Sequence, residues 1–393
     1  MPQARARLIV VAAAGLVLAL PLATQKVPLI TLAKPLVEHP EPLTQPVSIR
    51  ELADGRVLVT DMEERRLLLY DFVAKTAAPA ARQGAGPLEF QMPGQLFAIG
   101  DSTLMPDIMQ RRFLFLGPNG APLRTQSILQ ANDDILAVVR AGNIFAIDAR
   151  GQFYSEARAF VIKEGQMPTT SDTVALVRWA KFGVKGETLA TKYDKAPMPK
   201  MSGTAASSIK MRMPIVPYVT RDLWQVFPNG RVVVLRASDY HSEFIDPDGA
   251  RRTGPSVPYV PVPVTAADRE RLRKTTRETY ERAMKLGMSM ARSSSAQPLP
   301  KIAFDLDEPA EWPKFKPPFA NIFVAPDDFL WVATSAAGAE DIVTYDVLNA
   351  KGALVKRVRF PKNVVLLGFG RNALYATRKD EDDLRYLQRY SVP

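Results

Sequence analysis

The chain has 393 residues, of which 47% are apolar and 23% charged, a balance that indicates a folded protein with a large core. The formal net charge is +10, but the basic residues are dispersed among acidic ones, so we expect no nucleic-acid binding. The sequence contains no cysteine, which excludes disulfides, thiol nucleophiles, cysteine metal sites and lipid attachment through cysteine.

Residues 1–24 have the pattern of an export signal. Two arginines precede an uncharged run from Leu8 to Leu20, which has the length of a signal-peptide core and is too short for a full membrane span. We therefore expect a bacterial protein that is periplasmic or secreted. Because Pro21 occupies a position where cleavage favours small residues, an uncleaved N-terminal anchor is the alternative, and it is the only membrane contact that we expect.

A short pattern then returns six times along the chain: apolar residues two apart, a tight turn, and an alternating apolar strand. In the clearest copy, Asn229 and Gly230 form the turn between Trp224 and Val232. The other turns lie near Asp54, Asp101, Arg150, Asp327 and Arg371. Strand, turn and strand at a period of about 40 to 50 residues predict an all-β, six-bladed β-propeller over residues 27–393.

The last repeat has only three strands before the chain ends at Pro393. We expect the N-terminal segment from Pro28 to Val37 to supply its fourth strand, so that the two ends of the chain complete one blade. Such closure removes open sheet edges, which otherwise favour aggregation. The six inner strands are expected to begin near Val47, Gln95, Asn143, Asp222, Asn321 and Val364.

Two stretches share the spacing of an acid, a loop, an arginine and an apolar strand: Asp61 to Tyr70 and Asp107 to Leu116. A third stretch, from Arg82 to Pro93, is rich in glycine and contains Gly-Pro-Leu-Glu-Phe. On these motifs the chain resembles the NHL-type group of six-bladed propellers, especially secreted bacterial propellers of uncharacterised role. Leu88 stands where that group usually has glycine. The resemblance implies the fold over nearly the whole chain and implies no particular activity.

Two long excursions, residues 181–219 and 257–318, follow the outer strands of the third and fourth blades. Both are therefore expected on one face of the ring, the face that also carries the loops after the second strands. Thr265 and Asp268 form a capping box that opens a helix, which we expect to end at Gly287 and to lie partly exposed over the propeller. Methionines gather in these excursions; packing of the insert explains them, and copper(I) binding is the alternative.

Polar residues stand near the beginnings of the inner strands, where they would line one mouth of the central channel. In propeller hydrolases and lactonases, side chains at this mouth hold calcium, which prefers carboxylate and carbonyl oxygens. This set has a single carboxylate, so we predict ligand contacts and no metal ligands, with calcium as a possible cofactor. Asp61 and Asp107 are expected to bond loop amides or the following arginines. The candidate ligand-binding residues are Gln95, Asn143, Arg221, Asp222 and Asn321.

The chain has two histidines, the side chains that change charge near neutral pH. His39 lies in a proline-rich segment and is expected at the surface. His241 follows the second strand of the fourth blade, on the face with the excursions, and is the best single candidate for acid–base catalysis; the alternative is a loop residue with no catalytic role. The sequence contains no Gly-x-Ser-x-Gly, phosphate-loop or His-Glu-x-x-His motif.

These observations predict a monomeric, exported binding module rather than an enzyme. A rigid ring presents several loops around one concavity, and we expect a protein partner or a small-molecule or glycan ligand to bind on that loop-rich face. The alternative is a calcium-dependent hydrolase or lactonase, or a carbohydrate lyase, that uses the channel mouth. A structural envelope protein whose N-terminal segment stays in the membrane is a third possibility.

Overall fold

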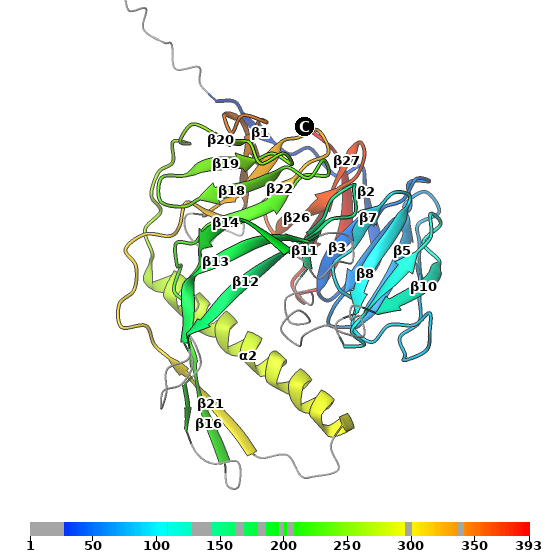
Figure 1. Ribbon diagram of the computed structural model, residues 1–393, viewed down its shortest axis with the longest axis horizontal. Coiled ribbons are helices and arrows are strands. Elements are labelled where there is room, and N and C mark those ends of the chain that lie inside the picture. Colours follow the sequence, from blue (N-terminus) through cyan, green and yellow to red (C-terminus); the bar gives the residue numbers. More distant parts are fainter. Residues whose placement is uncertain are drawn as a thin grey trace, which may run out of the picture.

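Six sheets, each built on four antiparallel strands, form a β-propeller in the computed structural model (Figure 1). The structure describes residues 27–107, 109–127, 144–161, 169–179, 186–195, 200–202, 208–294, 301–336 and 342–393. At four of the six junctions between neighbouring blades, the first strands lie side by side. The six-bladed propeller predicted from the repeats is therefore confirmed.

The first four blades follow one another along the chain. Blade one comprises β3 (Pro46–Glu51), β4 (Val57–Asp61), β5 (Arg66–Asp71) and β6 (Thr76–Pro79). Blade two comprises β7 (Phe97–Ile99), β8 (Ser102–Asp107), β9 (Arg112–Leu116) and β10 (Pro122–Ser127). Blade three comprises β11 (Ile144–Ile147), β12 (Phe153–Val161), β13 (Thr169–Trp179) and β14 (Gly186–Tyr193). Blade four comprises β17 (Leu223–Val226), β18 (Val232–Arg236), β19 (His241–Ile245) and β20 (Arg251–Thr253).

The last two blades incorporate the N-terminal strands. Blade five comprises β22 (Phe319–Val324), β23 (Leu330–Thr334), β24 (Thr344–Leu348) and β25 (Leu354–Arg359), with β1 (Leu29–Thr31) added in parallel along β25. Blade six comprises β26 (Val364–Phe369), β27 (Ala373–Lys379) and β28 (Arg385–Ser391), and its outer strand is β2 (Val37–Leu43), antiparallel to β28.

Closure by an N-terminal strand is thus observed, but with a later segment than expected. The segment from Pro28 to Val37 does not complete blade six; its residues Leu29–Thr31 extend blade five instead. Pro28 and Pro35 lack the N–H that a paired strand donates, so this segment forms only a short strand. Leu32 then enters the core between blades five and six, and the chain reaches blade six only at Val37.

The core of the ring lies between the blades. Buried apolar clusters of the described residues each join two neighbouring blades, one cluster for each of the six junctions. At the junction of blades four and five, for example, Val233 and Phe244 pack with Ile322 and Leu330. Alternating strand residues face opposite sides of a sheet, so every inner blade strand contributes to two junctions.

Glycines set the turns that make the repeats recognisable. Gly230, between β17 and β18, has a φ of 87°, and Gly55, at the same place in blade one, has a φ of 86°. A side chain is strained in this left-handed region. At Gly230 an added Cβ would also lie 2.8 Å from an oxygen of Asp148 in blade three. The turn glycine therefore serves both the hairpin and the fit between blades.

The two excursions form a separate small structure that we call the arm, built from a three-stranded sheet and one helix (Figure 1). The sheet consists of β15 (Lys200–Ser202), β16 (Ser208–Pro214) and β21 (Lys301–Asp307), and the helix is α2 (Ala266–Ser294). The chain leaves the ring after β14 and after β20, both fourth strands, so both excursions begin on the loop-rich face. In Figure 1 the arm projects away from the ring.

The first excursion is shorter than the predicted range 181–219. Gly186–Tyr193 is β14, which pairs with β13 as the outer strand of blade three, so the excursion begins after Tyr193. The sequence pattern missed this strand because β14 is an exposed outer strand with only Leu189 and Lys192 buried among its described residues.

The helix begins as predicted and ends later. Asp268 N donates to Thr265 Oγ1 over 3.1 Å, and Thr265 N donates to Asp268 Oδ2 over 3.0 Å, which confirms the capping box. The helix continues through Gly287 to Ser294. Glycine inside a helix costs about 1 kcal/mol and does not by itself end it, and the backbone of Gly287 is not left-handed as a helix-ending glycine commonly is.

α2 packs against one face of the arm sheet. Phe304 of β21 pairs in register with Met211 of β16, so both side chains lie on the same face. Tyr280 of α2 contacts the ring of Phe304 edge-on at 6.3 Å, and its hydroxyl donates to Pro214 O over 3.0 Å.

Candidate functional site

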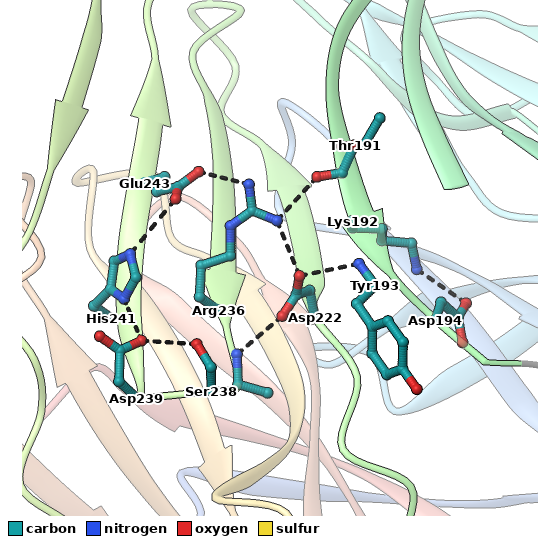
Figure 2. Close-up of polar contacts among 11 residues, drawn as sticks. Thr191, Lys192, Tyr193, Asp194, Asp222, Arg236, Ser238, Asp239, His241 and Glu243 are labelled. Carbon is teal, nitrogen blue, oxygen red and sulfur yellow. Dashed lines mark hydrogen bonds and ion pairs between the residues drawn. The ribbon is translucent and has the colours of Figure 1, made fainter. Parts of the chain in front are cut away.

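Asp222, the carboxylate predicted at the channel mouth, is engaged by three donors from two blades (Figure 2). Its Oδ2 accepts Tyr193 N at 3.0 Å and Arg236 Nη1 at 2.9 Å, and its Oδ1 accepts Ala237 N at 3.0 Å. Asp222 N donates in return to Tyr193 O. The first excursion leaves the ring at Tyr193 and returns at Asp222, so these bonds staple its base. An ion bound here would have to displace them.

A chain of charged contacts runs from Arg236 to His241 (Figure 2). Arg236 Nη2 lies 2.7 Å from Glu243 Oε2, and this bond holds the pKa of Glu243 below its ordinary value. His241 Nε2 lies 3.6 Å from the other oxygen of Glu243, and its Nδ1 lies 2.6 Å from Asp239 Oδ1. His241 therefore stands between two carboxylates at the start of β19, and the bond from His241 lowers the pKa of the exposed Asp239.

The other predicted mouth residues do not join this network. Gln95, Arg221 and Asn321 are exposed, and Asn321 Oδ1 accepts the neighbouring Ile322 N at 2.9 Å. Asn143 lies outside the described residues. No hydrogen bond or ion pair among the described residues links any two members of the predicted set. Among the residues that the structure describes, no three histidine, aspartate or glutamate side chains lie close enough together to hold a metal ion.

Asp61 and Asp107 act as predicted, as acceptors for loop amides. Asp61 accepts Thr44 N at 2.8 Å and Gln45 N at 3.0 Å, which ties the end of β4 to the chain entering β3. Asp107 does the same in blade two with the amides that precede β7. Both carboxylates are fully buried. In blade four the order is reversed. The carboxylate of Asp222 precedes the first strand, β17, and the amide of Ala237 that donates to it follows the second strand, β18.

His39 is buried, contrary to the expected surface position. Only 2% of the residue is exposed, and its ring contacts Tyr70 edge-on at 4.6 Å. Burial lowers its pKa, outweighing the backbone bond at Thr76 and the charge of Glu41. The sequence placed His39 in a loop because Pro40 and Pro42 flank it, whereas it lies in β2 and packs where blade six meets blade one.

A cavity that the sequence did not predict lies on the outer side of blade five. It measures about 420 Å³ and is bounded by residues 257–264, which we call the strap, and by the strands of blade five. The strap pairs with the returning chain, since Lys316 N donates to Val262 O and Val264 N donates to Lys314 O. The lining residues are Val27, Pro258, Tyr259, Val260, Val262, Lys316, Pro317, Pro318, Thr334, Ser335, Thr344, Asp346, Leu354 and Arg357.

Charged side chains form ion pairs at the base of this cavity. Lys316 Nζ lies 2.8 Å from Asp268 Oδ1, at the beginning of α2. Burial favours the protonated form of Asp268, but its bonds to Lys316 and Thr265 outweigh this and hold its pKa below the ordinary value. Arg357 Nε lies 2.8 Å from Asp346 Oδ1.

Tyr240 completes this second pair, since its hydroxyl donates to Asp346 Oδ2 over 2.9 Å. Burial and the charge of Asp346 raise the pKa of Tyr240 well above its ordinary value. The partners in these two ion pairs belong to blades four and five, to α2 and to the chain that returns to blade five. The only sequence signal of the cavity was the density of prolines in the second excursion.

Comparison with known proteins assigns no function to the chain. No family model and no curated protein sequence matches the chain. The structure is similar to a protein described as exported from Bacteroides fragilis, with a TM-score of 0.44 and 11% identity over 93% of this chain and 95% of that one.

Two further solved structures match at comparable levels. Regucalcin, a calcium-binding protein from Agrobacterium tumefaciens, has a TM-score of 0.41 and 12% identity over 93% of this chain and 97% of its own. Virginiamycin B lyase from Staphylococcus aureus has a TM-score of 0.41 and 9% identity over 91% and 98%. At these identities the likeness concerns the propeller architecture, which hosts many unrelated functions.

No helix in the part of the chain that the structure describes combines the length and the apolar character needed to cross a membrane.

Proposed function

We propose that this protein is an exported, monomeric binding module, an NHL-type propeller, that holds a protein partner on its loop-rich face with the arm as the main contact. Its location would be periplasmic or secreted, as the N-terminal arginines and apolar run predict. Protein is favoured over a glycan or another small ligand because the arm offers an extended surface rather than an enclosed site.

The observation that carries this proposal is the incomplete burial of the apolar layer between α2 and the arm sheet. Phe304, Met211 and Tyr280 are each only half-buried. Along the part of α2 whose burial is described, Asp268 is the one fully buried residue. Burial of apolar surface contributes roughly 25 cal/mol per Å², so a partner that covers this layer gains free energy that the arm leaves unused.

The chemistry of this layer suits a protein surface. The half-buried face of α2 includes Met284 and Met288, and the sheet adds Met211 and Met213. Methionine side chains are flexible and polarizable, so they adapt to partner shapes. Exposed apolar surface rimmed by charges is typical of interaction sites, and α2 carries eight basic and four acidic residues around its apolar stripe.

The enzyme alternative has less support. A calcium-dependent hydrolase or lactonase, or a lyase, would use Asp222 and His241. Asp222 already accepts three hydrogen bonds that staple the first excursion. His241 lies between Asp239 and Glu243. These two contacts would fix the position of its ring in a binding module as well as in an enzyme, so they do not favour the enzyme. A screen of esters, lactones and glycans with His241→Ala as the inactive control decides the matter: activity lost in that variant would replace the binding proposal.

The test of the proposal is photo-crosslinking in the exporting cell. A photoreactive phenylalanine at Met288 samples the arm, and the same residue at Val73, which is 96% exposed on blade one, is the matched control. We expect one protein adduct from position 288 and none from 73. The purified partner should then bind Met288→Glu at least tenfold more weakly than Val73→Glu, a difference of about 1.4 kcal/mol. Equal adducts from both positions would refute the arm as the contact.

A further inference from the structure

The cavity beside blade five is a second candidate binding site, and it is independent of the arm surface. We propose that it binds a carboxylate group carried on a compact apolar body. The argument rests on the donors at its base, the acceptors already used there, and the apolar rim.

The first donor is the Lys316 ammonium group. Only 7% of this side chain is exposed. Two of its three hydrogens are engaged, by Asp268 Oδ1 at 2.8 Å and by Ala336 O at 2.9 Å. An ammonium group has three donors; the ring of Tyr218 is centred 5.5 Å from Nζ, but the third donor finds no hydrogen-bond acceptor among the described residues. A buried donor without a partner costs free energy, so a ligand oxygen placed there is stabilising.

The second donor is the Arg357 guanidinium group. Its Nε donates to Asp346 Oδ1 over 2.8 Å and its Nη2 donates to Pro258 O over 3.1 Å. A guanidinium group has five N–H bonds, so Nη1 and one hydrogen of Nη2 stay without an acceptor in the described structure. Arg357 is about one-third exposed, which leaves these hydrogens accessible from the cavity side.

The acceptors of the site are already used. Asp346 accepts from Arg357 and from Tyr240, and it is 1% exposed. Asp268 accepts from Lys316 and from the capping residue Thr265. A bound cation would therefore face two positive groups and find no free carboxylate oxygen of comparable quality. A hydrocarbon would leave the Lys316 hydrogen unsatisfied. A carboxylate supplies the missing acceptors, and its hydrogen bonds to cationic donors are the strong ones.

The apolar side chains that line the cavity favour a ligand whose body is apolar. Tyr259 and Val260 form part of the rim, and Val260 is 84% exposed. Leu354 of β25 also lines the cavity. Five prolines line the cavity or lie in its strap and fix the backbone there before any ligand arrives. They are Pro258, Pro261, Pro263, Pro317 and Pro318. A cavity of about 420 Å³ fits a small organic acid or the last residue or two of a peptide.

The test uses the full mature protein and pairs of ligands that differ only in charge. One arm measures benzoate and 4-methylpentanoate against their amides. The other measures a tripeptide ending in valine with a free or an amidated terminus. We expect each free acid that binds to do so at least tenfold more tightly than its amide. Binding in the first arm identifies a free organic acid as the source, and binding in the second alone identifies a polypeptide end.

Two variants locate the site. Val260→Glu puts a negative charge on the exposed rim without removing a buried contact, and it should weaken acid binding at least tenfold; Val73→Glu is the control. Lys316→Gln keeps hydrogen-bond donors for Asp268 and removes the charge, so it should abolish the preference for acid over amide. Equal affinity for acids and amides, no binding down to a dissociation constant of about 10 mM, or no effect of Val260→Glu would overturn the proposal. None of these outcomes tests the proposal that the arm contacts a protein partner.

Discussion

The ring and the arm of this protein are built from the same chain but differ in how completely they are packed. At the blade junctions, side chains as large as Trp331 and Tyr240 are fully buried, and buried carboxylates are matched to amides or arginines. In the arm, Phe304 and Tyr280 meet but stay half-exposed. The difference suggests a division of roles: the closely packed ring supplies the scaffold, and the arm leaves apolar side chains half-exposed for the partner that we propose.

The largest effect should come from removing Asp222, at the base of the first excursion. Asp222→Ala leaves Tyr193 N and Ala237 N without their acceptor and Arg236 with one partner fewer. We expect the free energy of unfolding to fall by about 3 kcal/mol, measured by chemical denaturation. Asp239→Ala, at an exposed carboxylate of the same network, should leave the free energy of unfolding nearly unchanged. A stable Asp222→Ala protein would return Asp222 to the list of ligand-binding candidates.

A second prediction separates the arm from the ring in stability. Tyr280→Ala removes the ring contact with Phe304 and the bond to Pro214 O. We expect it to destabilise the arm by about 2 kcal/mol while the ring is unchanged. Hydrogen exchange should quicken in α2 and β21 and stay constant in β18 and β23. Faster exchange throughout the chain would show that arm and ring unfold as one unit.

The capping box gives a smaller effect within the arm. Thr265→Ala removes the acceptor of Asp268 N and should weaken the beginning of α2 by about 1 kcal/mol. Thr275→Ala is the matched control, because Thr275 Oγ1 bonds back to Arg271 O inside the helix and alanine favours the helix there. Circular dichroism and exchange of the first helical turn should move in opposite directions for the two variants.

The smallest predicted effect concerns pH and the ring alone. Burial lowers the pKa of His39 in the folded protein, whereas the unfolded chain has the ordinary value of about 6.5. As pH falls below about 6.5, the unfolded state takes up a proton that the folded state resists, so the free energy of unfolding decreases until pH passes the folded pKa. His39→Gln should flatten the dependence of the denaturation midpoint between pH 7.5 and 5.5. His241→Gln should leave the His39 contribution in place; an unchanged slope in His39→Gln would contradict it.

Local patterns sufficed for the blades and failed where distant segments meet. The turn glycines and the capping box follow from neighbouring residues, and the amide contacts of Asp61, which reach 16 and 17 residues back, follow from a spacing that recurs at Asp107, so the sequence predicted them. The staple at Asp222 depends on the end of β14, which lies 29 residues earlier. The burial of His39 depends on β2 pairing with β28 at the other end of the chain. Neither relation leaves a local signature.

The cavity could not be predicted for the same reason: its residues are far apart in the sequence. Its base combines Tyr240 and Asp346, which are 106 residues apart, with Asp268 and Lys316 from the second excursion. Each residue alone has the appearance of an ordinary strand or helix residue. Only the strap, which brings them together, was visible as a run of prolines between two valines.

The position of β2 constrains how the molecule is made. This strand is synthesised before any complete blade, yet its partner β28 ends only two residues from the C-terminus. During translation, and during any passage through a secretion channel, the first strands must wait unpaired while more than three hundred residues follow. The ring can therefore close only after β28 has been synthesised, and deletion of β28 would leave β2, at the other end of the ring-forming sequence, without its partner.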